Sequence, residues 1–190
     1  AVQALHANGI NVIMDVVYNH VADSGNFCFN KIVPGYFSRT NADGSYSNGS
    51  GCGNDTASER AMVRKYIVDS IVYWAEEYHI DGFRFDLVGL LDATTINELV
   101  DAVHAKRPKV IFYGEGWSLG TAAEPGTVMA TQVNSSQTPN FGYFNDTLRD
   151  LLAGRNGTTT GIVSGRKGQE ETWSYCFKGD AYWCHNPTQT

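Results

Sequence analysis

Three short apolar runs, separated by two stretches of helical periodicity, constrain the fold of this sequence more than any other feature. The runs are residues 10–18, 81–87 and 110–113, and the first is almost continuous in β-branched and other apolar residues. Such a run is typical of a strand that is buried on both faces of a parallel sheet. The order strand, helix, strand, helix, strand predicts repeated βα units, and therefore an α/β fold that is either a barrel or a doubly wound sheet.

The helical stretches between these strands follow from apolar residues that recur about every 3.6 positions. The first stretch predicts a helix of about twenty residues with Ser58 as its N-cap. The second begins behind Asp92 or Thr94 and stops at Pro108, because proline cannot continue a helix. An aromatic stripe on the first helix has helical spacing and is predicted to belong to the core: Tyr66, Trp74 and Tyr78.

Two further helical segments are predicted toward the ends of the sequence. Residues 1–9 have the pattern of the last turns of a helix, with Gly9 as the C′ residue that closes it. Residues 145–152 form a short amphipathic stretch that ends at Gly154, and the segment after it receives no assignment. Because the sequence starts inside a helical pattern and without Met, we expect it to be a fragment of a longer chain.

Composition and charge exclude several classes of partner. The chain is 42% hydrophobic and 12% aromatic, so it can bury a sizeable core. Its formal net charge is −6 and its Lys and Arg residues are scattered, which excludes a basic stripe for nucleic acid or an anionic membrane surface. The four cysteines are too few for a disulfide scaffold and lack the spacing of a zinc site. Cellular compartment and oligomeric state stay open.

Residues 20–57 form a long segment rich in Gly, Ser, Asn and Asp. We expect a long loop or a small inserted lobe, of the kind that carries function in a compact domain. Asp23, Asp43 and Asp55 in this segment carry oxygen ligands that suit calcium. Scattered acids in such a loop are more often solvated, so we predict no metal.

Polar side chains cluster at or near the C-terminal end of each predicted strand. In a parallel barrel these ends open on one face, so residues that lie far apart in the sequence meet there. The sequence therefore predicts an active site built from Asp15, Asn19 and His20 of the first strand, Arg84 and Asp86 of the second, and Glu115 and Trp117 of the third.

Two of these carboxylates have surroundings that suit opposite chemical roles. Arg84 lies two residues before Asp86 on the same side of the strand, and an adjacent cation favours the ionised carboxylate that a nucleophile requires. Glu115 lies between Tyr113 and Trp117, which can reduce its solvation and raise its pKa, as a general acid requires. Such a pair is the glycosidase arrangement, and a separation of about 5 Å leads to retention through a covalent intermediate.

Three motifs in this order resemble signature regions of the α-amylase superfamily: DVVYNH (15–20), DGFRFDL (81–87) and GEGW (114–117). PGYFSRTNADG (34–44), SGCGNDTASER (50–60) and residues 62–87 are more similar to type I pullulanases than to ordinary α-amylases. The resemblance covers residues 1–154. It implies that Asp86 is the nucleophile, Glu115 the acid/base and Arg84 the partner that keeps Asp86 ionised. It also implies roles for His20 as a hydrogen-bond donor to the sugar, for Asp15 as an organiser of the site and for Asn19 as its support.

The sequence departs from the superfamily pattern in one respect. The family uses a third carboxylate, an Asp directly after a His on a later strand, and no His-Asp pair occurs in these 190 residues. We expect that acid beyond Thr190 and the earlier strands before Ala1. The resemblance therefore implies part of one catalytic (β/α)8 TIM barrel across residues 1–190, from roughly the third strand onward, and an isolated chain that is inactive. Some relatives bind calcium near the loop after the first motif, which keeps calcium as an alternative.

The function that this resemblance implies is retaining hydrolysis of α-1,6-glucosidic branch linkages in pullulan, glycogen or starch dextrins, without an organic cofactor. One alternative is another activity of the superfamily, on α-1,4 links or in branch transfer. A second is a carbohydrate-binding paralogue without catalysis, which the presence of both Asp86 and Glu115 argues against. A nucleotide-binding sheet is excluded because no strand–helix junction carries a phosphate-binding glycine motif. For Trp117, sugar binding and packing stay equally open.

Overall fold

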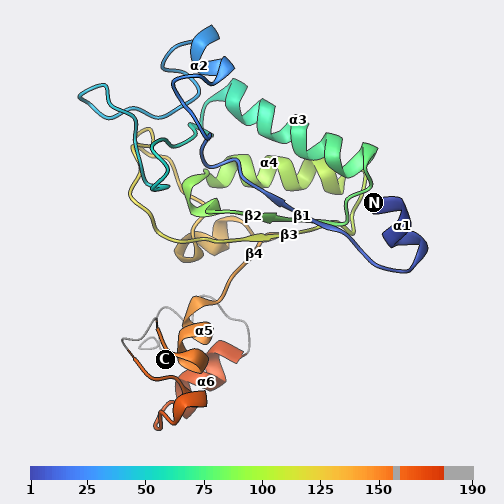
Figure 1. Ribbon diagram of the computed structural model, residues 1–190, viewed down its shortest axis with the longest axis vertical. Coiled ribbons are helices and arrows are strands. Elements are labelled where there is room, and N and C mark those ends of the chain that lie inside the picture. Colours follow the sequence, from blue (N-terminus) through green and yellow to red (C-terminus); the bar gives the residue numbers. More distant parts are fainter. Residues whose placement is uncertain (156–158, 178–190) are drawn as a thin grey trace. The chain divides into compact units, whose positions relative to one another are not determined.

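A parallel sheet runs through the larger part of the chain (Figure 1). Its strands β1 (Ile13–Val16), β2 (Gly82–Phe85) and β3 (Ile111–Gly114) pair in parallel in that order, and the short β4 (Gly142–Tyr143) comes fourth. The register aligns Asp15 with Arg84, and Arg84 with Tyr113. The three predicted strands and the parallel α/β arrangement are confirmed.

The computed structural model describes residues 1–155 and 159–177. The chain divides into two compact units, Ala1–Gly142 and Tyr143–Thr190, and strands β1 to β3 belong to the first. The expectation that residues 1–190 belong to one barrel domain stays a prediction.

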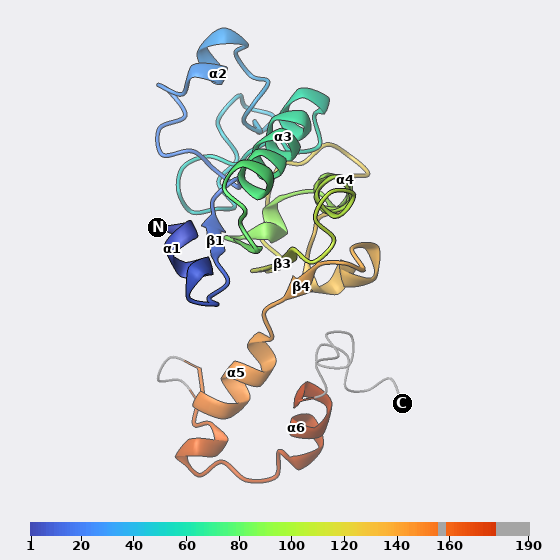
Figure 2. The same ribbon diagram turned by 90° about the vertical axis from the view of Figure 1, so that its right-hand side faces the viewer.

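Helices α3 (Ala61–Glu77) and α4 (Ala93–His104) lie side by side on one face of the sheet (Figures 1 and 2). Beneath them the rings of Phe83 and Phe112 stack with their centroids 5.7 Å apart, and both side chains are buried. Burying one such ring contributes about 1.5–3 kcal/mol. On the opposite face Ile13 is 43% and Ile111 53% exposed. The prediction that the first strand is buried on both faces is therefore wrong, because helices cover only one face of this sheet in the described residues.

The start of α3 differs from the sequence expectation. Its N-cap is Arg60, and Ser58 is buried two residues earlier. The Ser58 hydroxyl donates to Oδ2 of Asp92 at 2.7 Å and accepts from the Asp92 amide at 2.9 Å. Asp92 in turn caps α4 by accepting from the amide of Thr95 at 2.9 Å, which settles the choice between Asp92 and Thr94. Ser58 therefore supports the start of the second helix instead of the first.

The aromatic stripe on α3 is not part of the core. Tyr66 is 39% and Tyr78 46% exposed, and Trp74 is half-buried. The buried face of α3 instead follows a strict four-residue spacing through Val63, Ile67, Ile71 and Ala75. The aromatic residues lie on the flank of that face, so the prediction of a core role for them is wrong.

Two of the predicted helix ends are observed, at Gly9 and Gly154, whereas α4 ends at His104, before the predicted stop at Pro108. After helix α1 (Val2–Ala7), the Gly9 amide donates to the His6 carbonyl oxygen and the Ile10 amide donates to the Leu5 carbonyl oxygen. Gly9 has a φ of 72°, a backbone conformation that favours glycine. In the second unit, α5 (Asp146–Ala153) begins at the side-chain cap of Asn145 and ends at Gly154. Helix α6 (Glu170–Phe177) and a 3-10 turn, Ile162–Ser164, lie in the segment that received no assignment.

The long segment 20–57 contains helix α2 (Cys28–Ile32) and two isolated bridges, Ser38 with Thr56 and Thr40 with Tyr46. Its cysteines Cys28 and Cys52 are free, exposed thiols. Within the ranges that the structure describes, none of the helices is long and apolar enough to span a bilayer.

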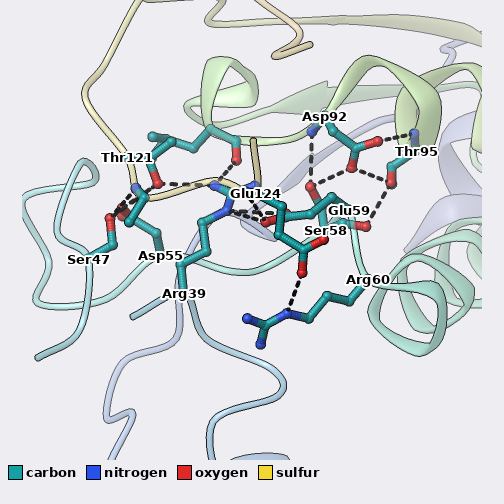
Figure 3. Close-up of polar contacts among 12 residues, drawn as sticks. Arg39, Ser47, Asp55, Ser58, Glu59, Arg60, Asp92, Thr95, Thr121 and Glu124 are labelled. Carbon is teal, nitrogen blue, oxygen red and sulfur yellow. Dashed lines mark hydrogen bonds and ion pairs between the residues drawn. The ribbon is translucent and has the colours of Figure 1, made fainter. Parts of the chain in front are cut away.

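A buried arginine ties this segment to the loops that follow the strands (Figure 3). Arg39 is fully buried and pairs with Glu59 at 2.7 Å. Its guanidinium also donates to the carbonyl oxygen of Leu90 at 2.7 Å and to the hydroxyl of Thr121 at 3.1 Å. Leu90 follows β2 and Thr121 follows β3, so one side chain holds together the loops at the C-terminal edge of the sheet.

Replacing Arg39 with methionine is expected to lower the free energy of unfolding by about 3 kcal/mol, because it leaves the almost fully buried Glu59 without its cation. Chemical denaturation of the variant and the wild type measures this loss. The matched control is Lys65→Met, which breaks a pair with Asp69 whose two side chains are each 61% exposed. That control should cost less than about 1 kcal/mol. Equal losses in the two variants would contradict the account.

Candidate active site

One guanidinium brings together the three predicted acids at the C-terminal edge of the sheet. Arg84 Nη1 donates to Asp15 Oδ1 at 2.9 Å and to Asp86 Oδ1 at 3.2 Å. Its Nη2 donates to Glu115 Oε1 at 2.7 Å. Asp15, Arg84 and Glu115 come from three neighbouring parallel strands, so the convergence follows from the register of the sheet. The sequence suggested only Asp86 as a partner of Arg84, and the structure adds Asp15 and Glu115.

Arg84 supplies the positive charge of this cluster. Burial acts to lower the pKa of Arg84, but its hydrogen bond with Asp15 and the charge of Glu115 outweigh burial and raise that pKa above its usual value. The guanidinium therefore stays cationic among the three carboxyl groups that contact it. Asp86 and Glu115 are largely buried, whereas the side chain of Asp15 is 66% exposed. Such a site suits a neutral substrate that develops positive charge during reaction.

Backbone hydrogen bonds hold Asp86 and Glu115 in place just past the last residues of β2 and β3. The Asp86 amide donates to Val16 at 3.0 Å, and the Glu115 amide donates to Phe85 at 3.1 Å. Leu87, directly after Asp86, has a φ of 39°, which is strained for a residue other than glycine. Its amide donates to Glu115 Oε2 at 3.3 Å. The strained turn thus aims one amide at the predicted acid/base.

Asn19 joins the first strand's loop to Asp86. This fully buried side chain donates through Nδ2 to the carbonyl oxygen of Asp86 at 2.7 Å and to its Oδ2 at 3.0 Å. Those two acceptors fix the orientation of the amide, so Asn19 Oδ1 accepts from Nδ1 of His20 at 2.5 Å. A neutral His20 ring then presents Nε2 as an acceptor. The resemblance implies that His20 donates a hydrogen bond to a sugar hydroxyl. With Nδ1 donating to Asn19, Nε2 can donate to the sugar only when both ring nitrogens carry a proton.

Trp117 lies half-buried after Glu115. Its backbone packs against Gly89, where an added Cβ would lie 2.0 Å from the Trp117 carbonyl oxygen. Gly89 therefore permits the close approach of the loops that follow β2 and β3, a role that the sequence did not suggest.

The three acids considered for calcium lie in different surroundings. Asp23 and Asp43 are exposed and accept bonds from Asn26 and Ser45 in their own turns. Asp55 is fully buried, so the expectation of a solvated acid is wrong for it. Across the part of the chain that the structure describes, no group of three or more His, Cys, Asp or Glu side chains has the geometry to hold a metal ion.

Asp55 is the shared acceptor of a group of hydrogen bonds in its loop (Figure 3). Its carboxylate accepts hydrogen bonds from Ser47, Gly49, Ser50 and Thr121 at 2.6–2.9 Å. Burial acts to raise the pKa of Asp55, but these donors outweigh burial and lower it below its usual value. No local sequence pattern indicates this role, because Thr121 lies 66 residues away.

A pH dependence of stability follows from this lowered pKa. Asp55 stabilises the fold fully above its unfolded pKa of about 3.9, and that contribution is lost as the pH falls through the lower folded pKa. Asp55→Asn is therefore expected to destabilise the protein most above about pH 5 and progressively less below about pH 4. Urea unfolding of both proteins across this range measures the difference. A difference that does not shrink in acid would contradict the assignment.

Comparisons with known proteins agree with the sequence resemblance. No protein-family model matches the chain. Over 184 residues, or 96% of its length, the chain is 42% identical to a pullulanase of Bacillus subtilis strain 168, and it covers 26% of that protein. Over 166 residues, or 80% of its length, it is 43% identical to the chloroplastic pullulanase 1 of Arabidopsis thaliana, of which it covers 17%.

Solved structures show the same similarity. A pullulanase from Paenibacillus barengoltzii in complex with maltohexaose and α-cyclodextrin is 46% identical with a TM-score of 0.86, covering 90% of this chain and 26% of that one. A pullulanase from Anoxybacillus sp. LM18-11 in complex with maltotetraose is 42% identical with a TM-score of 0.89. The match covers 94% of this chain and 26% of that one. The chain thus spans between 17% and 26% of the length of these relatives. It is pullulanase-like over most of its length, and these similarities support a glycoside hydrolase of the α-amylase family.

Proposed function

We propose that this chain forms part of the catalytic (β/α)8 barrel of a retaining hydrolase that cleaves α-1,6-glucosidic linkages in pullulan, glycogen or starch dextrins. The observation that carries the proposal is the contact of Arg84 with Asp15, Asp86 and Glu115 at the ends of three parallel strands. Two carboxylates on either side of a sugar are the groups that glycoside hydrolysis requires.

The uncovered face of the sheet supports the barrel. Ile13 and Ile111 on that face are about half exposed, although both are large and apolar. Asp15 and Arg84 lie one pleat further along the same face. In a closed barrel this face is the interior, where the remaining strands would cover the two isoleucines. The chain would supply strands from roughly the third onward, with residues 20–57 as a long loop or small lobe above them.

In the first step the Asp86 carboxylate attacks the anomeric carbon. The bond to the branch oxygen breaks as Glu115 donates its proton to that oxygen, and a glucosyl ester forms on Asp86. In the second step Glu115 takes a proton from water, which attacks the same carbon and releases the sugar with its original configuration. Asn19 and Arg84, which contact different oxygens of Asp86, would hold the nucleophile in place.

No organic cofactor is needed for this reaction, and the third acid of the superfamily would come from a later part of the protein. The pullulanases to which the chain is similar were solved with maltooligosaccharides, which supports an α-glucan as the substrate here. His20 and Asp15 would contact or organise the sugar in the cleavage subsite, and Trp117 would lie beside it.

Product analysis of pullulan treated with the full-length protein tests this function. We expect maltotriose as the product of α-1,6 cleavage. Panose or isopanose would instead indicate an α-1,4 hydrolase of the same superfamily. Binding to pullulan without any product would indicate a carbohydrate-binding paralogue. Residues 1–190 alone should release no product, because they lack the third acid.

A further inference from the structure

The segment 54–56 is joined to the residues around His20 by three hydrogen bonds. The Asn54 side chain accepts from the Val21 amide at 2.9 Å through Oδ1 and donates to the Val21 carbonyl oxygen at 2.6 Å through Nδ2. The Thr56 amide donates to the carbonyl oxygen of Asn19 at 2.9 Å. The backbone is therefore fixed on both sides of His20, at Asn19 and at Val21.

Asn54 has no other assigned role, and its surroundings make its position rigid. Its side chain is almost fully buried, at 2% exposure. The carbonyl oxygen of Asn54 accepts from the Ser50 hydroxyl at 2.7 Å, and the next residue, Asp55, is held by four donors. A carboxamide that bonds to both backbone groups of one residue replaces the pairing that a neighbouring strand would provide. Because this loop is irregular, no strand among the described residues provides that pairing at Val21.

We propose that Asn54 is a positioning residue, which acts through the backbone of Val21 to hold the His20 ring at the cleavage subsite. The proposal rests on the proposed glycoside hydrolase function and extends it to a residue that does not touch the substrate. The contacts form a continuous series: Asn54 holds Val21, Thr56 holds Asn19, and the Asn19 side chain binds both His20 and Asp86. Loss of the Asn54 amide frees the Val21 side of His20, while the contact of Asn19 with Asp86 remains.

A double-mutant cycle in the full-length enzyme tests this role. On the α-glucan that the wild type hydrolyses, Asn54→Ala is expected to lower kcat by about 10–100-fold, with a change in KM of less than about threefold. In a His20→Ala background the same substitution should lower kcat by less than about threefold, because the group that it positions is already absent. Multiplicative losses in the two backgrounds would overturn the proposal, because they would show a general structural role.

Two further variants keep the test informative. Asn48→Ala removes another asparagine of the loop, which accepts from the Gly53 amide at 2.6 Å, and it should leave kcat unchanged. Asn54→Asp keeps the size of the side chain and the acceptor for the Val21 amide, but it loses the donor for the Val21 carbonyl. It is expected to show the same coupling to His20, and it serves as the test if Asn54→Ala does not fold.

A measurement that does not depend on activity separates this proposal from the proposed function. In a crystal structure of Asn54→Ala, the His20 ring is expected to shift from Asn19 or to become disordered, while Asp86 keeps its contact with Asn19. An unchanged His20 would overturn the proposal even if the enzyme cleaves pullulan. A displaced His20 in a protein that hydrolyses no glucan would support the positioning role and refute the proposed function.

Discussion

Asp86→Ala in the full-length enzyme is expected to lower kcat on pullulan by at least about 10⁴-fold, because it removes the group that forms the covalent intermediate. The comparison of initial rates for maltotriose release measures this loss. Asp86→Asn should lose as much activity while it keeps the size of the side chain, so the loss would not reflect a cavity. Asp69→Ala is the matched control, since this exposed acid on α3 pairs with Lys65 and lies outside the site. Residual activity above about 1% in either Asp86 variant would show that another group is the nucleophile.

Glu115→Gln is expected to lower kcat on pullulan by about 10²–10⁴-fold, because the amide can neither protonate the branch oxygen nor activate water. The effect should depend on the leaving group. With α-maltotriosyl fluoride, whose fluoride leaves without a proton, formation of the glucosyl ester should be nearly as fast as in the wild type. Rapid-quench measurement of fluoride release follows that step directly.

Azide tests the role of Glu115 as the general base in the second step. Because azide is a nucleophile that needs no general base, it should restore turnover of the fluoride by Glu115→Gln and produce an α-configured glycosyl azide. If the rate of the first step falls equally on pullulan and on the fluoride, and azide does not restore turnover, the role of Glu115 is contradicted. In that case Glu115 would serve to bind Arg84 and the Leu87 amide.

The sequence predicted the sheet and the place of the candidate site because both depend on local patterns. Residues 81–87 and 110–113 are short apolar runs between helical segments, so the parallel order followed from the repeat alone. Asp86 and Glu115 were predicted because each lies at or near the C-terminal end of such a run. Parallel strands share one edge, which is why the strand pattern alone was enough to group Asp15 with these two acids.

The partners of these residues could not be predicted, since they depend on register and on contacts between distant segments. Arg84 was expected beside Asp86, but the register of β1, β2 and β3 also places Asp15 and Glu115 around it. Ser58 satisfies the local rule for a helix cap, yet Asp92, 34 residues away, takes its hydroxyl. Asp55 resembles a solvated loop acid because nothing near it in the sequence reveals the burial that the long loop produces.

The most direct test of the central claim is to identify the residue that becomes glycosylated. The Glu115→Gln enzyme is treated with α-maltotriosyl fluoride, which lets the ester form and slows its hydrolysis, and the digested protein is analysed by peptide mass spectrometry. We expect a single maltotriosyl group on the peptide that contains Asp86, bound through the Asp86 carboxylate. A label on another carboxylate, or release of a β-configured product without any label, would contradict it.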